Sequence, residues 1–214
     1  HNEADIKAEN INRMGREGFN LSVRLFDKNV PIHLPFLGEC NIYNALAAMA
    51  TGCSLGIEPD NIKAGLRNTK LLPNRYEITK HEGATIINDS YNANPKSMQE
   101  ALKTLKDYQC EGRRFFVIGD MLELGDLAES AHEKLGVEVT KHSIDYLVTV
   151  GSLSSLVTKS ALASGMDKKN IAAATEHKCA VAFLKKHLIS GDCLLVKGSR
   201  GARMEEIIKQ LTAC

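Results

Sequence analysis

Eight consecutive residues, 88–95, hold much of the candidate chemistry and read Asn-Asp-Ser-Tyr-Asn-Ala-Asn-Pro. They include the carboxylate of Asp89 and the amides of Asn92 and Asn94. An apolar run precedes them and a helix-like segment, 96–108, follows. Ligands of open α/β sheets bind at such strand-to-helix junctions, and a helix N-terminus adds free N–H groups. The alternative is that these residues cap the helix and form a turn.

A second polar segment, 197–201, follows the last apolar run and reads Lys-Gly-Ser-Arg-Gly. Lys197 and Arg200 are cations and Ser199 supplies a hydroxyl, a combination that favours a carboxylate, a phosphate or an acyl-phosphate. We expect this segment to open the last helix. The alternative is a glycine-rich turn whose cations face water. The segment is not a P-loop, because the pattern GxxxxGK[ST] does not occur in the sequence.

A third segment, 119–125, reads Gly-Asp-Met-Leu-Glu-Leu-Gly and places Asp120 and Glu123 after an apolar run. These carboxylates could contact an ammonium group or order the loop, and the alternative is that they are solvated. His132 lies on the helix that we expect to follow.

Two amides and one cation complete the candidates. Asn41 and Asn44 are three residues apart, near one face of a predicted Ala-rich, buried helix, 41–53. A buried amide without a partner costs about 1–3 kcal/mol, and an adenine edge could supply the partner. Helix capping explains them equally well. Arg75 follows a predicted boundary at 71–74 and is either a ligand or a linker residue with surface contacts.

Composition excludes several classes of protein. The 214 residues carry 27 basic and 26 acidic side chains, which gives no basic excess for nucleic acid. No apolar stretch approaches the roughly 20 residues that cross a bilayer, and the polar start, 1–5, is not a secretory signal. The six cysteines are scattered without a CxxC pair, so we predict neither disulfides nor a metal site, and a cytoplasmic location.

The periodicity changes along the chain. Residues 19–25 and 30–34 alternate like a β-hairpin with a turn at 27–29, and helices are predicted at 41–53 and 59–67. From Arg75 onward, apolar runs alternate with helical segments, which predicts an α/β fold: a Rossmann-like, mostly parallel sheet flanked by helices, preceded by an α+β unit. The predicted strands are 76–79, 84–87, 114–118, 146–150, 170–173 and 193–196, and the predicted helices are 96–108, 128–142, 154–164, 178–189 and 202–211.

The strings at 88–95, 119–125 and 197–205 resemble signatures of the Mur ligases, a family of bacterial cell-wall amide ligases, and within it the branch that adds D-alanyl-D-alanine. His132 also falls where that branch tends to have a histidine. The resemblance implies that residues 74–214 are the family's C-terminal domain. It implies that residues 1–73 are the closing part of the central ATP-binding domain. Where the family usually has Gly-Arg this chain has Asn74-Arg75, and Cys40 replaces the histidine that usually precedes the asparagine at 41.

The resemblance also implies a two-step reaction. ATP phosphorylates the terminal carboxylate of UDP-N-acetylmuramoyl-tripeptide, and the amine of D-alanyl-D-alanine attacks the acyl-phosphate. Asp89 and Arg75 are then expected to bind ATP, and Asn41 and Asn44 its adenine. The residues expected to hold the dipeptide or the intermediate are Asn92, Asn94, Lys197, Ser199 and Arg200. No residue is expected with certainty to be a general acid or base.

The same family places its P-loop, its Mg2+ ligands and its UDP-binding domain upstream of the matching region. We therefore expect this chain to be a piece of the enzyme, inactive alone, with the other domains of the same protein as partners and without membrane or nucleic-acid partners. Two alternatives remain: a sister Mur or folylpolyglutamate-type ligase, and a non-catalytic Rossmann-like binding module.

Overall fold

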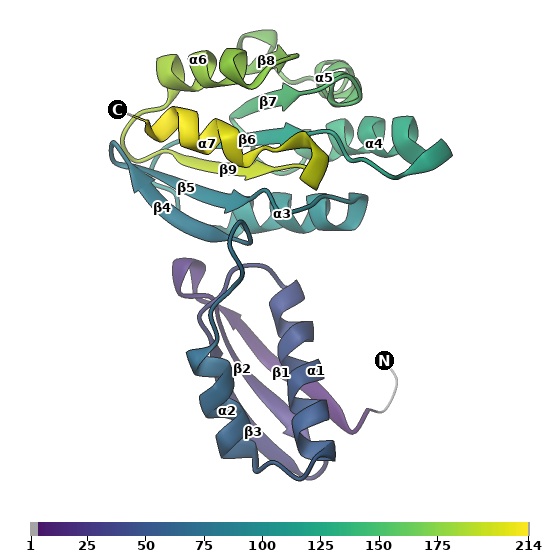
Figure 1. The fold of residues 1–214 in the computed structure, drawn as a ribbon, viewed down its shortest axis with the longest axis vertical. Coiled ribbons are helices and arrows are strands. Elements are labelled where there is room, and N and C mark those ends of the chain that lie inside the picture. The colour runs from purple at the N-terminus through teal and green to yellow at the C-terminus, as the bar shows by residue number, and fades with distance from the viewer. Residues whose placement is uncertain (1–3, 214) are drawn as a thin grey trace. The chain divides into compact units, whose positions relative to one another are not determined.

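The computed structural model describes residues 4–213, and the chain divides into two compact units, His1–Leu71 and Leu72–Cys214 (Figure 1). Within the described part of the chain, no helix combines the length and apolar character needed to cross a membrane.

The first unit is a three-stranded antiparallel sheet in the order β1-β2-β3, with two helices (Figure 1). Alternate apolar residues of β2 and β3 face these helices and form one core with the buried side of α1. The opposite face of these strands carries mostly polar side chains. The elements are β1 (Ile6–Arg13), the 3-10 turn η1 (Gly15–Glu17), β2 (Phe19–Leu25), β3 (Lys28–Leu34), α1 (Cys40–Ser54) and α2 (Pro59–Asn68).

The sequence-based expectations for this unit need three corrections. β1 was not predicted, because its apolar alternation stops after Ala8. The hairpin turn lies at Phe26-Asp27, one residue earlier than expected. Helix α1 is buried along one face rather than on most sides, and Tyr43 is 72% exposed.

The second unit is a six-stranded sheet in the order β4-β5-β9-β6-β7-β8. β4 pairs antiparallel with β5, and the remaining neighbours pair in parallel. The strands are β4 (Glu77–His81), β5 (Ala84–Asp89), β6 (Arg114–Gly119), β7 (Tyr146–Val150), β8 (Ile171–Ala174) and β9 (Cys193–Lys197). The helices are α3 (Pro95–Asp107), α4 (Ala128–Thr140), α5 (Ser154–Ala163), α6 (His177–His187) and α7 (Glu205–Thr212), and the 3-10 turns are η2 (Gly125–Leu127), η3 (Lys168–Asn170) and η4 (Arg200–Ala202).

Helices cover both faces of this sheet, which confirms the predicted fold class. α6 and α7 share a core with one set of alternating strand residues, and α3, α4 and α5 lie on the other side (Figure 1). The β5 and β9 strands are buried at every position, as expected for central parallel strands.

The last helix differs from the expectation. It does not begin at residue 202 but at Glu205, because Arg203 takes a left-handed conformation with φ +48° that separates η4 from α7. The segment 197–201 therefore leads into a 3-10 turn and does not open the helix directly.

Candidate functional site

The parallel strands β5, β6, β7 and β9 end at the same edge of the sheet. We call the loops that follow them, 90–94, 120–124, 151–153 and 198–204, the rim. In an open α/β sheet this edge is where ligands bind. The candidate residues of the second unit other than Arg75 lie on the rim or at the strand ends that lead into it.

The end of β5 and the end of β9 meet in a buried ion pair. Asp89 and Lys197 are direct neighbours in the strand register, and the Lys197 Nζ lies 2.6 Å from the Asp89 Oδ2. The same ammonium donates to the carbonyl oxygen of Asn92 at 2.9 Å. Burial raises the pKa of Asp89 above its ordinary value, although the Lys197 ammonium and the Tyr76 backbone N–H oppose the shift.

Arg75 is held at this edge by an aromatic ring. Its guanidinium carbon lies 4.2 Å from the centre of the Tyr91 ring, a cation–π contact. The Tyr91 N–H donates to the carbonyl oxygen of Asn74 at 3.0 Å. Asn74 has φ +62°, a left-handed conformation that glycine and asparagine adopt most readily. Asparagine can therefore stand in the position before Arg75 without displacing it.

Asn92 and Asn94 have different surroundings. Asn94 is the N-cap of α3: its side chain accepts from the Ser97 N–H at 2.9 Å, and Ser97 Oγ accepts from the Asn94 N–H at 3.0 Å. The capping explanation therefore holds for Asn94, and Pro95 occupies the first helical turn, where its missing N–H needs no partner. Asn92 is exposed, and its side-chain oxygen accepts from the Ala93 N–H.

Ser199 and Arg200 point into different environments. Ser199 is buried; its Oγ accepts from the Leu122 N–H at 2.9 Å and donates to the Ala93 carbonyl at 3.2 Å. The Arg200 side chain is 63% exposed and pairs with Glu205 at 3.0 Å. Sequence reasoning did not single out Glu205, whose second carboxylate oxygen is buried without a hydrogen-bond partner among the described residues. Its place in the string 197–205 was the available signal.

Hydrogen bonds fix the first residues of the loop after β6. Asp120 Oδ1 accepts from the N–H and the Oγ of Ser154 at 2.7 and 2.6 Å. The carboxyl group of Asp120 also fills the space where any side chain at Gly151 would lie. The Met121 N–H donates to Nε2 of the buried His132, whose Nδ1 lies 2.7 Å from a helix carbonyl oxygen and so donates to it. Asp120 therefore orders the loop, one of the two roles expected for it.

In the first unit, Asn41 and Asn44 bond to each other in the first turn of α1. The Asn44 Nδ2 donates to the Asn41 Oδ1 at 3.2 Å, and the Asn41 Nδ2 donates to the Leu37 carbonyl oxygen at 2.7 Å. Asn41 is buried and Asn44 is exposed. The capping alternative does not hold here, because both asparagines lie inside α1 and its N-cap is Glu39, without a side-chain cap hydrogen bond; the Asn41 amide instead finds its partners within the first unit.

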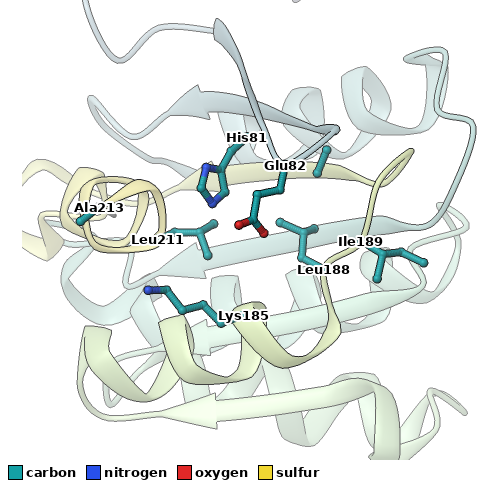
Figure 2. A pocket seen from close by; sticks show the side chains of 8 residues that line it. His81, Glu82, Lys185, Leu188, Ile189, Leu211 and Ala213 are labelled. Carbon is teal, nitrogen blue, oxygen red and sulfur yellow. The ribbon is translucent and has the colours of Figure 1, made fainter.

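A cavity of about 320 Å³ lies at the other edge of the second unit's sheet (Figure 2). It is bounded by the β4–β5 turn, the segment before β9 and the end of α7, and its lining residues are His81, Glu82, Ala84, Lys185, Leu188, Ile189, Leu211 and Ala213. These residues flank the amino ends of β5 and β9, whereas the rim follows their carboxyl ends. The cavity is therefore separate from the candidate site. Among the described residues, no group of three or more His, Cys, Asp or Glu side chains could hold a metal ion.

The mostly parallel sheet with polar loops at its carboxyl edge defines a Rossmann-like α/β class. Residues 74–200 match the family described as "Mur ligase, glutamate ligase domain". The chain belongs to this Mur ligase family.

Individual relatives agree over almost the whole chain. The chain is 35% identical to the UDP-N-acetylmuramoyl-tripeptide–D-alanyl-D-alanine ligase of Bacillus subtilis over 97% of its own length and 45% of that protein. The ligase of the same name from Escherichia coli is also 35% identical, over 97% of this chain and 44% of that protein. One crystal structure of MurF from Acinetobacter baumannii superimposes with a TM-score of 0.87 at 29% identity, over 99% of this chain and 46% of that one. The chain thus spans about 45% of the length of these relatives.

Proposed function

We propose that the protein is an ATP-dependent amide-bond ligase of peptidoglycan precursor synthesis. It joins D-alanyl-D-alanine to UDP-N-acetylmuramoyl-tripeptide through an acyl-phosphate. The observation that carries the proposal is the similarity, over 97% of the chain, to ligases named for this reaction. The geometry supports it, because Arg75, Lys197 and Asp89 place two cations and a carboxylate at the edge of the sheet where α/β proteins bind ligands. Since the reaction consumes ATP and a nucleotide-linked precursor, we place it in the cytoplasm.

On the nucleotide side, Arg75 and Asp89 are the proposed ATP ligands. Tyr91 supports the Arg75 guanidinium, which keeps a cation at the rim for a phosphate, and the Asp89 carboxylate can accept from a ribose hydroxyl. Asn41 and Asn44 are the proposed adenine contacts. The described residues provide no cluster suited to Mg2+, so we assign no step of the reaction to a metal held by them.

On the acceptor side, the proposed group is Asn92, Asn94, Lys197, Ser199 and Arg200. Asn92 and Arg200 are exposed and can reach a dipeptide carboxylate or the developing oxyanion directly, whereas the Asn94 side chain is used as the cap of α3. Lys197 is buried and holds the loop after β5 through Asn92. Such positioning is what a two-substrate ligation requires, because the amine must meet the acyl-phosphate in a fixed orientation.

The division of the chain follows from the same proposal. Residues 74–214 correspond to the C-terminal domain of a Mur ligase, and residues 1–73 to the closing part of the central ATP-binding domain. The remaining parts of the ligase are the expected partners of this chain, and the chain alone is expected not to ligate.

The test uses the full-length gene product with ATP, Mg2+, UDP-N-acetylmuramoyl-tripeptide and D-alanyl-D-alanine. Mass spectrometry should detect the pentapeptide product, and phosphate release should require both substrates. We expect Asp89→Ala to raise KM for ATP and Arg200→Ala to impair use of the dipeptide, whereas Lys178→Ala, an exposed position on α6, is the control. Absence of the pentapeptide, or faster turnover with glutamate or another amino acid as acceptor, would refute the proposal and favour a sister ligase.

A further inference from the structure

One hydroxyl group at the rim contacts two loops that are far apart in the sequence. Ser199 Oγ accepts from the Leu122 N–H in the loop after β6 and donates to the Ala93 carbonyl in the loop after β5. The Ser199 N–H adds a third bond, to the Asp120 carbonyl at 3.1 Å. Ser199 itself belongs to the loop after β9, so this single residue joins three rim loops.

The surroundings of Ser199 favour this joining role over direct substrate contact. Its side chain is buried, and its hydroxyl already donates one bond and accepts another. Gly198 and Gly119 let the two loops approach, since a Cβ at Gly198 would lie 3.2 Å from the Cα of Gly119. A substrate acceptor would have to displace the Ala93 carbonyl from the hydroxyl, which would leave that buried oxygen unpaired.

The three joined loops carry the acceptor-side candidates. The loop after β5 contains Asn92, and the loop after β9 contains Arg200. The loop after β6 has Glu123 exposed in a left-handed conformation, φ +63°, at its outer end. Strained backbone of this kind persists where the surroundings fix it, and it gathers at functional sites.

We propose that Ser199 is a positioning residue, which holds the loops after β5, β6 and β9 in the one arrangement that binds the acceptor dipeptide. This inference rests on the proposed ligase function and deepens it. It gives the Ser199 hydroxyl an indirect role in dipeptide binding, through the backbone of Ala93 and Leu122.

The first measurement is amide hydrogen exchange on this chain. In Ser199→Ala the Leu122 N–H loses its acceptor, so its exchange should accelerate about fivefold, since a hydrogen bond contributes about 1 kcal/mol. The Met121 N–H, held by His132, should change far less and reports on the fold of the same loop. Ser155→Ala is the matched control, because its hydroxyl, in the first turn of α5, bonds to a single rim loop, at the Ser152 carbonyl. The Ser199→Thr variant retains the hydroxyl, and the extended backbone at this position suits a β-branched residue.

The second measurement is steady-state kinetics of the full-length ligase. Ser199→Ala should raise KM for D-alanyl-D-alanine about fivefold and leave KM for ATP nearly unchanged, and Ser199→Thr should restore most of the dipeptide affinity. A purely structural serine would lower the melting temperature and the active fraction while both KM values stayed constant. Unchanged Leu122 exchange, or faster exchange with an unchanged KM for the dipeptide, overturns the inference. If the wild-type protein makes no pentapeptide, the proposed function itself is overturned. This result is distinct from the exchange and KM results, which test only the role of Ser199.

Discussion

The buried ion pair between Asp89 and Lys197 offers the sharpest test of the energetics. Lys197→Met removes the ammonium while keeping an unbranched side chain of similar volume. It leaves the Asp89 carboxylate without its main partner, at a position where the two side chains are only 8% and 4% exposed. Removing one member of a buried pair in this way costs about 3–5 kcal/mol. We therefore expect the free energy of unfolding of the second unit to fall by that amount at neutral pH.

The pH dependence of this loss has a definite sign. Burial already raises the pKa of Asp89 above 3.8, and losing the Lys197 ammonium, which opposes the shift, raises it further. The variant is therefore least impaired below pH 3.8, where the carboxyl is protonated in the folded and unfolded states alike. Its deficit grows as the pH rises through the raised pKa of the folded protein.

The assay is urea unfolding followed by tyrosine fluorescence at several pH values. The chain has five tyrosines and no tryptophan, and all but Tyr43 lie in the second unit, so the signal reports mainly on that unit. The double variant Asp89→Asn with Lys197→Met carries no unpaired charge and should recover most of the lost stability. A deficit below about 1 kcal/mol, or one that grows on acidification, would show that the pair is not buried as described.

Three further outcomes are expected. Burial acts to raise the pKa of Asp192, but hydrogen bonds from Arg113 and from backbone N–H groups lower it. Asp192→Asn should thus lower the free energy of unfolding by about 1–3 kcal/mol at pH 7. Urea midpoints should show that the difference in stability from the wild-type protein disappears as the pH falls from 3.8 through the lowered pKa. Burial raises the pKa of Cys193 to about 12, so mass spectrometry after iodoacetamide treatment of the native protein at pH 8 should find Cys193 unlabelled and the exposed Cys179 labelled; equal labelling would contradict this. Asn94→Ala should lower the stability of the second unit by about 1 kcal/mol, and Asn94→Ser should not, in matched thermal melts.

Periodicity was sufficient to predict most of the second unit. The runs at the positions of β5, β6, β7 and β9 are mostly apolar, and each ends in or is followed by Gly or a charged residue. The type and location of these strands were therefore clear from the sequence. Because these runs end at Asp89 and at Lys197, both residues fall at the same edge of the sheet, and in the structure they form an ion pair. β1 could not be predicted because the second half of this strand is mostly polar. The start of α7 was misplaced because no sequence pattern marks an arginine with left-handed backbone.

The partners of the candidate side chains were not predictable in the same way. Ser199 was expected to face a ligand because it stands between cations and glycines. Its hydroxyl instead bonds to backbone groups of loops 77 and 106 residues away in the sequence. Such contacts depend on which loops fold over a residue, and local spacing does not encode them. Asn94 shows the opposite case, since capping chemistry is local and the sequence had already offered it as the alternative.

The position of β9 has a consequence for biosynthesis. This strand is the last one of its unit to leave the ribosome, yet it lies between β5 and β6 at the centre of the sheet. Neither β5 nor β6 can form its backbone hydrogen bonds to β9 until nearly the whole unit has been translated. A nascent chain that stops before residue 193 therefore lacks the central strand altogether, so premature termination should give a product for proteolysis rather than a folded second unit.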